Sequence, residues 1–357
     1  MPQFSYFRRL AVAGVVGMLA ATLAPPKAEA QQQPQRLRWQ MASGYPGSLV
    51  HIGTMGKRVE TQMAAISGGS FEIRFMEPGA LVPALQVLDG VSNGSIEAGW
   101  VSAGQYTGRN TALALFSAVP FGPEAGEFMA WMRYGGGQAL MDEVHAKFNI
   151  KSVICGITPP EASGWFRTEI KSLADLRGIR MRFFGLGARV VSKLGVQTTN
   201  QPGGELFQAL QLGTIDATEF GQPALDLGMG LHQVAKHYYF PGWHQPASLY
   251  HLYVHKPLWD GLSPQRRAMI ESVCDANVMF GLAEGEALQF GAMAELRQRG
   301  VTFHSWGPEF ISAFRTGWDQ VVAEETAANP DFKKVWDSLS TFRANYKIWG
   351  DLGYFRN

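Results

Sequence analysis

The sequence of 357 residues has few cysteines, no long apolar run beyond its first thirty residues, and no excess of charge of either sign. Basic residues number 31 and acidic residues 30, so the formal net charge is +1. A balance this even gives no general electrostatic reason to expect a nucleic acid as partner. Hydrophobic residues make up 46%, which is too high a fraction for a disordered chain. The length favours two globular domains, at roughly 100–200 residues each.

Several motifs of enzymes and metal sites are also missing. The sequence contains no G-x-x-x-x-G-K-[ST] phosphate loop, no H-E-x-x-H zinc helix and no G-x-S-x-G nucleophile elbow. Five of the eight histidines lie close together in the sequence, but no cysteine or acidic neighbour completes a zinc set among them: His232, His237, His244, His251 and His255. These absences favour a binding protein over an enzyme.

The first thirty residues are typical of a secretory signal peptide. Arg8 and Arg9 precede an apolar run, Leu10 to Leu23, and the small-residue site Ala28-Glu29-Ala30 follows. The run has about 14 residues, whereas a membrane-spanning helix needs about 20. We therefore expect cleavage near Ala30 and a soluble, periplasmic product with a net charge of about −1. The arginine pair leaves the export route, Sec or twin-arginine, open.

Only two cysteines are present, Cys155 in a strand-like run and Cys274 in a helix-like one. An exported protein could join them, but two cysteines do not make a disulfide framework. We expect two buried free thiols, without a catalytic role because neither lies near an obvious base.

The hydrophobic pattern predicts an α/β fold. Strands and helices alternate in two halves of the chain, and long helices follow, which favours two lobes around a cleft and largely parallel sheets. Strands are predicted at 37–42, 71–76, 97–102, 150–156, 179–183, 215–218, 250–255 and 301–303. Helices are predicted at 51–66, 81–93, 173–178, 188–194, 204–212, 263–298, 310–326 and 332–349.

Ligands of such sheets bind beyond the carboxyl ends of the strands. This rule directs attention to the loops after Ala42, Ser102, Ile157, Phe183 and Thr218. Three charged residues stand at or near these places: Arg182, Glu161 and Glu219. A guanidinium at a strand end can hold a carboxylate with two parallel hydrogen bonds. By pattern alone, however, each of these three residues is more often an ordinary surface charge.

Several blocks of the sequence resemble the extracytoplasmic solute receptors of tripartite ATP-independent periplasmic (TRAP) transporters, the DctP-like family. The blocks lie at 79–83, 178–182 and 205–217. Further matches are similar to the branch that binds 2-oxo acids, and they lie at 118–122, 164–167, 239–243 and 329–336. The resemblance runs from about Leu37 to Trp349 and implies a two-lobed, periplasmic-binding-protein-like fold that closes over its ligand.

The resemblance also implies a set of site residues. Arg182 would bind the ligand carboxylate, and a bridging cation would be held by the side chains of Glu161 and Glu219 and the backbone carbonyl of Phe220. The sequence departs from the 2-oxo-acid receptor at Glu161, where that receptor has an amide, and at Phe220, where it has tryptophan. The extra carboxylate favours Ca²⁺ over Na⁺ on charge grounds. Alternatively, Glu161 stays protonated or accepts a ligand hydroxyl, and no metal binds.

The same branch suggests that Tyr106 and Trp243 are aromatic walls of the pocket. Gln245, near the hinge, is a further candidate for ligand binding, and Gln245 and His244 both differ from the 2-oxo-acid receptor. The ligand can therefore differ as well.

These observations predict the solute-binding subunit of a TRAP transporter, binding a small 2-oxo or 2-hydroxy carboxylate and working with the transporter's membrane subunits. The first lobe is expected at 37–156 plus about 246–290, and the second at 157–245 plus about 291–327. Residues 328–357 form a C-terminal helical segment, which either packs on the chain's own lobes or supports a homodimer. The alternatives are an exported hydrolase or lyase using Glu161 and Glu219 as acid and base, or a receptor of the same fold for a signalling partner.

Overall fold

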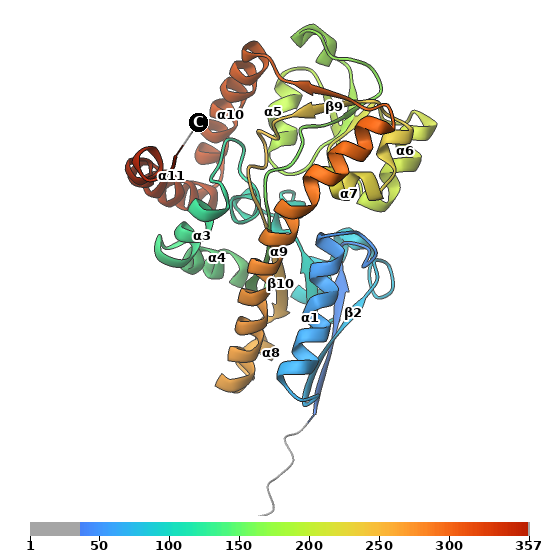
Figure 1. Cartoon of the computed structure of the whole chain (residues 1–357). Helices are drawn as coiled ribbons and strands as arrows, with labels where there is room; N and C mark the ends of the chain where they lie inside the picture. The colour runs from blue at the N-terminus through green and yellow to red at the C-terminus, as the bar shows by residue number, and fades with distance from the viewer. Residues whose placement is uncertain (1–35, 356–357) are drawn as a thin grey trace, which may run out of the picture. The chain divides into compact units, whose positions relative to one another are not determined.

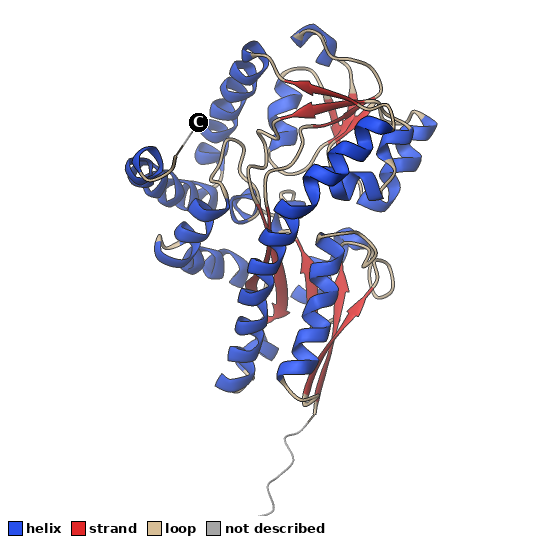
Figure 2. Cartoon of the chain, viewed as in Figure 1, coloured by secondary structure: helices blue, strands red, loops and turns tan. Residues whose placement is uncertain are grey.

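The computed structural model describes residues 36–355, so the predicted signal peptide lies outside the described residues. Within this range the chain forms two separate β-sheets with helices packed on them (Figure 1, Figure 2). The strands are β1 (Leu37–Ser43), β2 (Phe71–Met76), β3 (Ala98–Val101), β4 (Ile150–Thr158), β5 (Gly164–Phe166), β6 (Arg180–Arg182), β7 (Gln197–Thr199), β8 (Ala217–Thr218), β9 (His237–Phe240), β10 (Ser248–His255) and β11 (Thr302–Ser305). The α-helices are α1 (Ile52–Ile66), α2 (Val87–Ser92), α3 (Ala125–Tyr134), α4 (Gly137–Ala146), α5 (Gly187–Lys193), α6 (Leu206–Leu212), α7 (Pro223–Gly228), α8 (Lys256–Asp260), α9 (Pro264–Gln298), α10 (Pro308–Ala328) and α11 (Pro330–Leu352). No helix in residues 36–355 has the length and apolar character needed to cross a membrane.

The first sheet has the strand order β2-β1-β3-β10-β4. Alternation along β2 buries Phe71, Ile73 and Phe75 on one face, which is the pattern of a half-buried strand. Helix α1 packs on this strand and buries Met55, Val59 and Met63, which are spaced four residues apart along one side of the helix. These two elements build the core of the first lobe.

The second sheet has the strand order β11-β9-β5-β8-β6-β7. The prediction of largely parallel sheets is wrong in one respect, because each sheet contains a strand that is antiparallel to both of its neighbours. These strands are β10 in the first sheet and β5 in the second. Each is the first strand after the chain passes from one sheet to the other, from β4 to β5 and from β9 to β10. A third crossing, from β10 to β11, adds a strand that is parallel to its neighbour β9, so only the first two crossings bring antiparallel strands into the otherwise parallel sheets.

Helix α9 contacts both lobes, because it packs on α1 and β4 and also on α7 (Figure 1). Its Cys274 forms a disulfide with Cys155 of β4, so the prediction of two free thiols is wrong. The sequence assigned each cysteine to the right kind of element, but the packing of α9 on β4 places them together. Asn277, one turn further along, donates from Nδ2 to the carbonyl oxygens of Cys155 at 2.7 Å and Met55 at 3.1 Å. These contacts fix α9 against the first lobe.

Most predicted elements agree with the observed ones to within about three residues. Two predicted helices differ: the one at 81–93 begins as a 3₁₀ turn at Ala84 and is α-helical only over Val87–Ser92, and the one at 173–178 is a 3₁₀ helix, Leu173–Leu176. The predicted elements do not include α3, α4, α7, α8, β7 or β9. Helices α3 and α4 have only 10 residues each and are separated by glycines, so their apolar period is short. In β9, Tyr238 and Tyr239 are both buried, because the strand is covered on both faces and has no alternation to detect.

Helix α10 packs on the rest of the described chain along its whole length, whereas α11 does so mainly along its first turns. Asn329 caps α11, and its Oδ1 accepts hydrogen bonds from the backbone N–H groups of Asp331 and Phe332. Phe332, Val335 and Leu339 are fully buried against the core. The last turns of α11 differ, because their large apolar side chains are exposed: Ile348, Trp349 and Leu352.

Candidate functional site: a charged cavity between the lobes

A small cavity lies where segments from the two sheets meet. Its volume is about 20 Å³, which gives room for roughly one water molecule. The lining residues are Tyr45, Ile52, Glu161, Arg182, Phe184, Phe220, Gln245 and Tyr250. Four of the five loops selected from the sequence contribute to this lining, those after Ala42, Ile157, Phe183 and Thr218.

Arg182 and Glu219 form the charged centre of the site. Nη1 of Arg182 donates to Oε1 of Glu219 at 2.7 Å and to its backbone carbonyl oxygen at 2.8 Å. Nε donates to the carbonyl oxygen of Gln201 at 3.2 Å. Within residues 36–355, Nη2 makes no hydrogen bond, and Arg182 borders the cavity. One arm of the guanidinium therefore remains available to a ligand.

The pairing of β6 with β8 explains why these two residues meet. The strands are parallel, and Arg182 at the end of β6 lies opposite Thr218 at the end of β8. Glu219 is the next residue along the chain, so its carboxylate emerges beside the guanidinium at the carboxyl edge of the sheet. Its N–H donates back to the carbonyl oxygen of Arg182 at 3.2 Å. The sequence placed each residue at the end of a strand, and the resemblance to TRAP receptors assigned both to one site.

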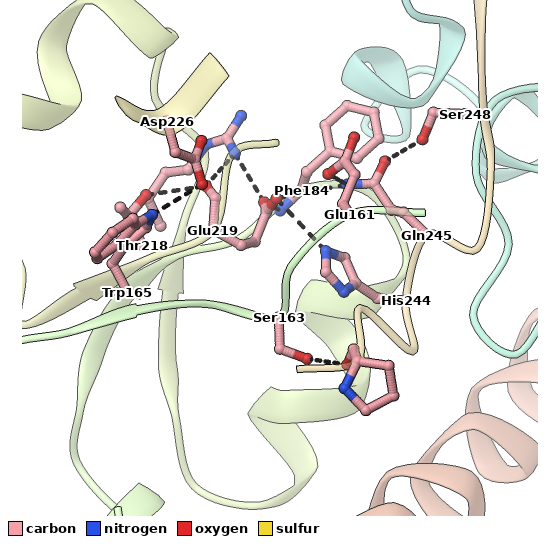
Figure 3. A network of polar contacts seen from close by, with 12 residues as sticks. Glu161, Ser163, Trp165, Phe184, Thr218, Glu219, Asp226, His244, Gln245 and Ser248 are labelled. Atoms are coloured by element: carbon pink, nitrogen blue, oxygen red, sulfur yellow. Dashed lines mark hydrogen bonds and ion pairs between the residues drawn. The ribbon is translucent and has the colours of Figure 1, made fainter. Parts of the chain in front are cut away.

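Glu161 approaches the same point from the segment between β4 and β5. Gln245, in the segment that leads from β9 to β10, donates from Nε2 to Oε2 of Glu161 at 2.7 Å and lies 3.5 Å from Oε2 of Glu219. Ser248 donates to the other end of the amide, Oε1, at 2.7 Å (Figure 3). The two segments are in close contact, because a Cβ on Gly242 would lie 2.1 Å from the carbonyl oxygen of Glu161. A glycine is required there by this close approach.

His244 completes the polar cluster. Its Nε2 lies 3.5 Å from Oε2 of Glu219, and its ring is 1% exposed (Figure 3). Neither ring nitrogen has a hydrogen-bond partner within the described part of the chain. Sequence analysis noted His244 only as a departure from the 2-oxo-acid receptor and gave it no role.

The buried carboxyl groups of Glu161, Glu219 and Asp226 differ in the direction in which their pKa values are shifted. Burial raises the pKa of Glu161 well above its usual value, and the nearby Glu219 and Asp226 raise it further. Burial also opposes ionisation of Glu219, but Arg182 and His244 outweigh it, and the pKa of Glu219 is lowered. Burial raises the pKa of Asp226 to about 7, although Tyr238 and Trp165 donate hydrogen bonds to its Oδ2. Of the two glutamates, Glu219 is therefore the one whose surroundings favour the charged form.

The donor set fits a small cation. Glu161, Glu219 and His244 each offer one ligand atom, and these atoms all lie within 4.8 Å of one another. Carboxylate and carbonyl oxygens are the ligands that hard cations such as Ca²⁺ prefer. A positive ion between Glu161 and Glu219 would favour the charged form of both carboxyl groups.

The two aromatic residues expected as pocket walls do not line this cavity. Tyr106 is buried, with its ring 6.3 Å from that of Tyr253. Trp243 packs its ring on Phe314 at 4.5 Å and on Phe121 at 5.5 Å. Trp243 therefore supports the segment that carries His244 and Gln245 rather than bordering the cavity itself.

Two other tyrosines line the cavity, and sequence reasoning missed them. Tyr45 follows β1 in one of the loops that the strand-end rule selected, so a signal for it was present. Tyr250 lies on β10, next to a register shift at which Cys155 of β4 has no partner residue. Such a bulge changes the direction of neighbouring side chains and leaves no trace in the hydrophobic pattern.

The comparison with protein families decides the class of this protein. Residues 44–329 match the model of the family described as bacterial extracellular solute-binding protein, family 7 (DctP). The chain belongs to this family. Family 7 proteins are periplasmic solute receptors of TRAP transporters, so the predictions of a receptor rather than an enzyme and of a two-lobed α/β fold are confirmed.

Among relatives of family 7, a monocarboxylate 2-oxoacid-binding periplasmic protein of Nostoc sp. is 35% identical over 88% of this chain and 86% of its own. A TRAP solute-binding protein of Bordetella bronchiseptica, a dimer with calcium and picolinate in one site, is 35% identical with a TM-score of 0.86. It is matched over 88% of this chain and 94% of its own. A TRAP solute-binding protein of Pseudoalteromonas atlantica, with bound sodium and pyruvate, is 28% identical with a TM-score of 0.85. It is matched over 90% of this chain and 100% of its own.

Proposed function

We propose that this protein is the TRAP receptor for a small 2-oxo or 2-hydroxy monocarboxylate, bound together with a cation. Arg182 binds the ligand carboxylate. Glu161, Glu219 and the backbone carbonyl of Phe220 hold the cation, which meets a second ligand oxygen. The observation that carries the proposal is the free arm of Arg182, which borders the same cavity as the buried carboxyl group of Glu161.

The charges at the site explain why a cation is needed. Arg182 is already paired with Glu219 at 2.7 Å, so the pair is neutral before any ligand binds. A ligand carboxylate would add a negative charge to a buried site, and ionised Glu161 would add another. An unpaired charge costs several kcal/mol in such surroundings. A cation supplies the missing positive charge, and a divalent ion such as Ca²⁺ does so better than Na⁺.

The chemical class of the ligand follows from the two attachment points. A 2-oxo or 2-hydroxy acid presents a carboxylate oxygen and a neighbouring oxygen, which together can chelate one cation while the second carboxylate oxygen reaches Arg182. Gln245 contacts Glu161 and is suited to orient it toward the ligand. Tyr45 and Tyr250 border the cavity from the first lobe and limit the size of the ligand. The relative with bound sodium and pyruvate supports this class, and the relative with bound calcium and picolinate supports a carboxylate that chelates a cation through a neighbouring donor atom.

The remaining assignments concern the whole receptor. The lobes comprise 37–156 with about 246–290, and 157–245 with about 291–327. The ligand passes from the closed receptor to the membrane subunits of the transporter, after export and removal of a signal peptide near Ala30. The exposed apolar side chains at the end of α11 support a homodimer formed through residues 328–357. The mass of the mature protein in solution tests the dimer.

A thermal-shift screen of small carboxylates tests the ligand class. Binding raises stability with the logarithm of ligand excess over the dissociation constant. We expect 2-oxo and 2-hydroxy acids to raise the Tm in the presence of Ca²⁺, and a chelator to remove the effect. If the increase in Tm persists after chelation, the protein is still a carboxylate receptor, but no cation is needed and Glu161 contacts the ligand directly. No shift with any carboxylate would contradict the proposal.

A further inference from the structure

His244 is a buried side chain that the proposed function does not use. Its exposed fraction is 1%, Nδ1 has no hydrogen-bond partner within residues 36–355, and Nε2 approaches Oε2 of Glu219 only to 3.5 Å, which is long for a hydrogen bond. A buried polar group without a partner costs about 1–3 kcal/mol. A buried polar group of this kind needs an explanation, and one explanation is a ligand that binds to it.

The position of the imidazole is fixed by aromatic packing. The ring of His244 meets the ring of Phe183 edge-on at 4.8 Å and the ring of Trp243 at 5.6 Å. Trp243 is itself stacked on Phe314 of α10. This wall holds the ring so that Nε2 is directed at the carboxylate of Glu219 (Figure 3).

The separation between His244 and Glu219 suits two ligands of one metal ion. Nε2 and Oε2 are 3.5 Å apart. With metal–ligand bonds of about 2.0–2.2 Å, two atoms at a tetrahedral angle lie roughly 3.4 Å from each other. Oε2 is not the oxygen that Arg182 and the backbone N–H of Phe184 bind, since both donate to Oε1. The ligand atoms of Glu161, Glu219 and His244 all lie within 4.8 Å of one another.

The kinds of atom in this triad select a class of cation. Ca²⁺ and Na⁺ are bound by oxygen, whereas imidazole nitrogen suits zinc and the other late first-row metals. We propose that the pocket also accepts a divalent cation of the Co²⁺ and Zn²⁺ class, with Nε2 of His244 as a ligand beside Glu161 and Glu219. The proposal rests on the cation pocket of the proposed function. It extends the cargo to carboxylates chelated to such a metal.

Cobalt binding to two variants of His244 tests this assignment. His244→Phe keeps the aromatic packing against Phe183 and Trp243 but removes both nitrogens. His244→Gln replaces the nitrogen donor by an amide that can offer an oxygen. The metal-free mature protein is titrated by calorimetry with Co²⁺ and, separately, with Ca²⁺. Both variants should bind Co²⁺ at least about tenfold more weakly, and their Ca²⁺ affinity should stay within about threefold of the original.

A spectroscopic readout identifies the ligand directly. Bound Cu²⁺ should show nitrogen hyperfine coupling in its electron paramagnetic resonance spectrum, and the coupling should disappear in His244→Phe. The matched control is His237→Gln, since His237 lies on β9, outside the cavity, and is paired with His304 at 3.0 Å. That variant should leave the coupling and the Co²⁺ affinity unchanged.

Two results would overturn the inference. One is an unchanged Co²⁺ affinity in both His244 variants, and the other is an equal loss of Ca²⁺ and Co²⁺ binding, which would make the role of His244 purely structural. Failure of the proposed function gives a different result, because no carboxylate would then raise the Tm in the presence of Ca²⁺, whatever Co²⁺ does.

Discussion

Nη1 of Arg182 donates to both the side chain and the backbone carbonyl of Glu219, at 2.7 and 2.8 Å, although the two residues are 37 positions apart in the sequence. Both side chains are buried, and their opposite charges balance each other. A ligand carboxylate and a cation would add a second pair of opposite charges to the same site. Arg182 thus serves the fold and the ligand at once. A substitution at this position must be chosen so that the two roles can be separated.

Arg182→Lys should weaken carboxylate binding by roughly ten- to a hundredfold. Lysine keeps the positive charge beside Glu219 but loses the planar fork, and with it a charged hydrogen bond of about 1.5–3 kcal/mol. Calorimetric titration with pyruvate measures the loss. Arg182→Ala should cost at least about 3 kcal/mol, part of it because Glu219 is left buried without its partner.

The control for this series is Arg180→Lys. Arg180 lies on the same strand, but its side chain is 45% exposed and pairs with Asp216. Its substitution should leave the affinity for pyruvate unchanged. Equal effects at the two positions, or near-original affinity in Arg182→Ala, would refute the assignment of Arg182.

Removing the disulfide should destabilise the protein without changing the ligand it selects. Cys155 and Cys274 are 119 positions apart, and closing a loop of that length corresponds to about 4–5 kcal/mol in the chain-entropy account. Urea unfolding of the double variant Cys155→Ala, Cys274→Ala measures the loss. Thiol labelling of the unfolded, unreduced protein provides the check, since two reactive thiols per chain would show that the disulfide is not formed.

Asp226→Asn should change the pH dependence of stability. The pKa of Asp226 is raised to about 7 in the folded protein by burial, against about 3.9 in the unfolded chain. The folded state therefore binds the extra proton between these values. The stability that the protonated group contributes is complete below about pH 4 and is lost as the pH rises toward 7, at up to roughly 1.4 kcal/mol per pH unit.

Asparagine cannot ionise, and it can still accept the hydrogen bonds from Trp165 and Tyr238. The free energy of unfolding of the Asp226→Asn variant, relative to that of the original protein, should therefore increase as the pH rises from 4.5 to 8. Urea unfolding at both pH values, with a chelator present, gives this difference. A difference that is the same at both pH values would show that Asp226 ionises normally in the folded state.

The site residues that could be predicted best are those whose positions follow from the ends of strands. Arg182 and Glu219 end neighbouring parallel strands, and that relation alone brings them together. Glu161 follows the strand that crosses to the second sheet, and the resemblance to TRAP receptors supplied its role. These residues could be found because their position depends on the ends of regular elements.

Other features depend on packing that no local pattern reveals. The direction of β10 and the bulge beside Tyr250 follow from the chain's passage between sheets. The disulfide requires α9 to pack on β4, and the position of Trp243 behind His244 requires α10 to pack beside it. Tyr106 and Trp243 were expected at the cavity from the resemblance, but aromatic residues fit the core of a protein as well as the wall of a pocket.

The most direct test of the account is a calorimetric titration of pyruvate into the metal-free mature protein, with and without added Ca²⁺. The charge balance at Arg182, Glu219 and Glu161 predicts binding with Ca²⁺ and a loss of at least about tenfold in affinity without it. Equal affinity in the two titrations would contradict the bridging cation. Absence of binding by pyruvate and by every other 2-oxo or 2-hydroxy acid under both conditions would contradict the ligand class itself.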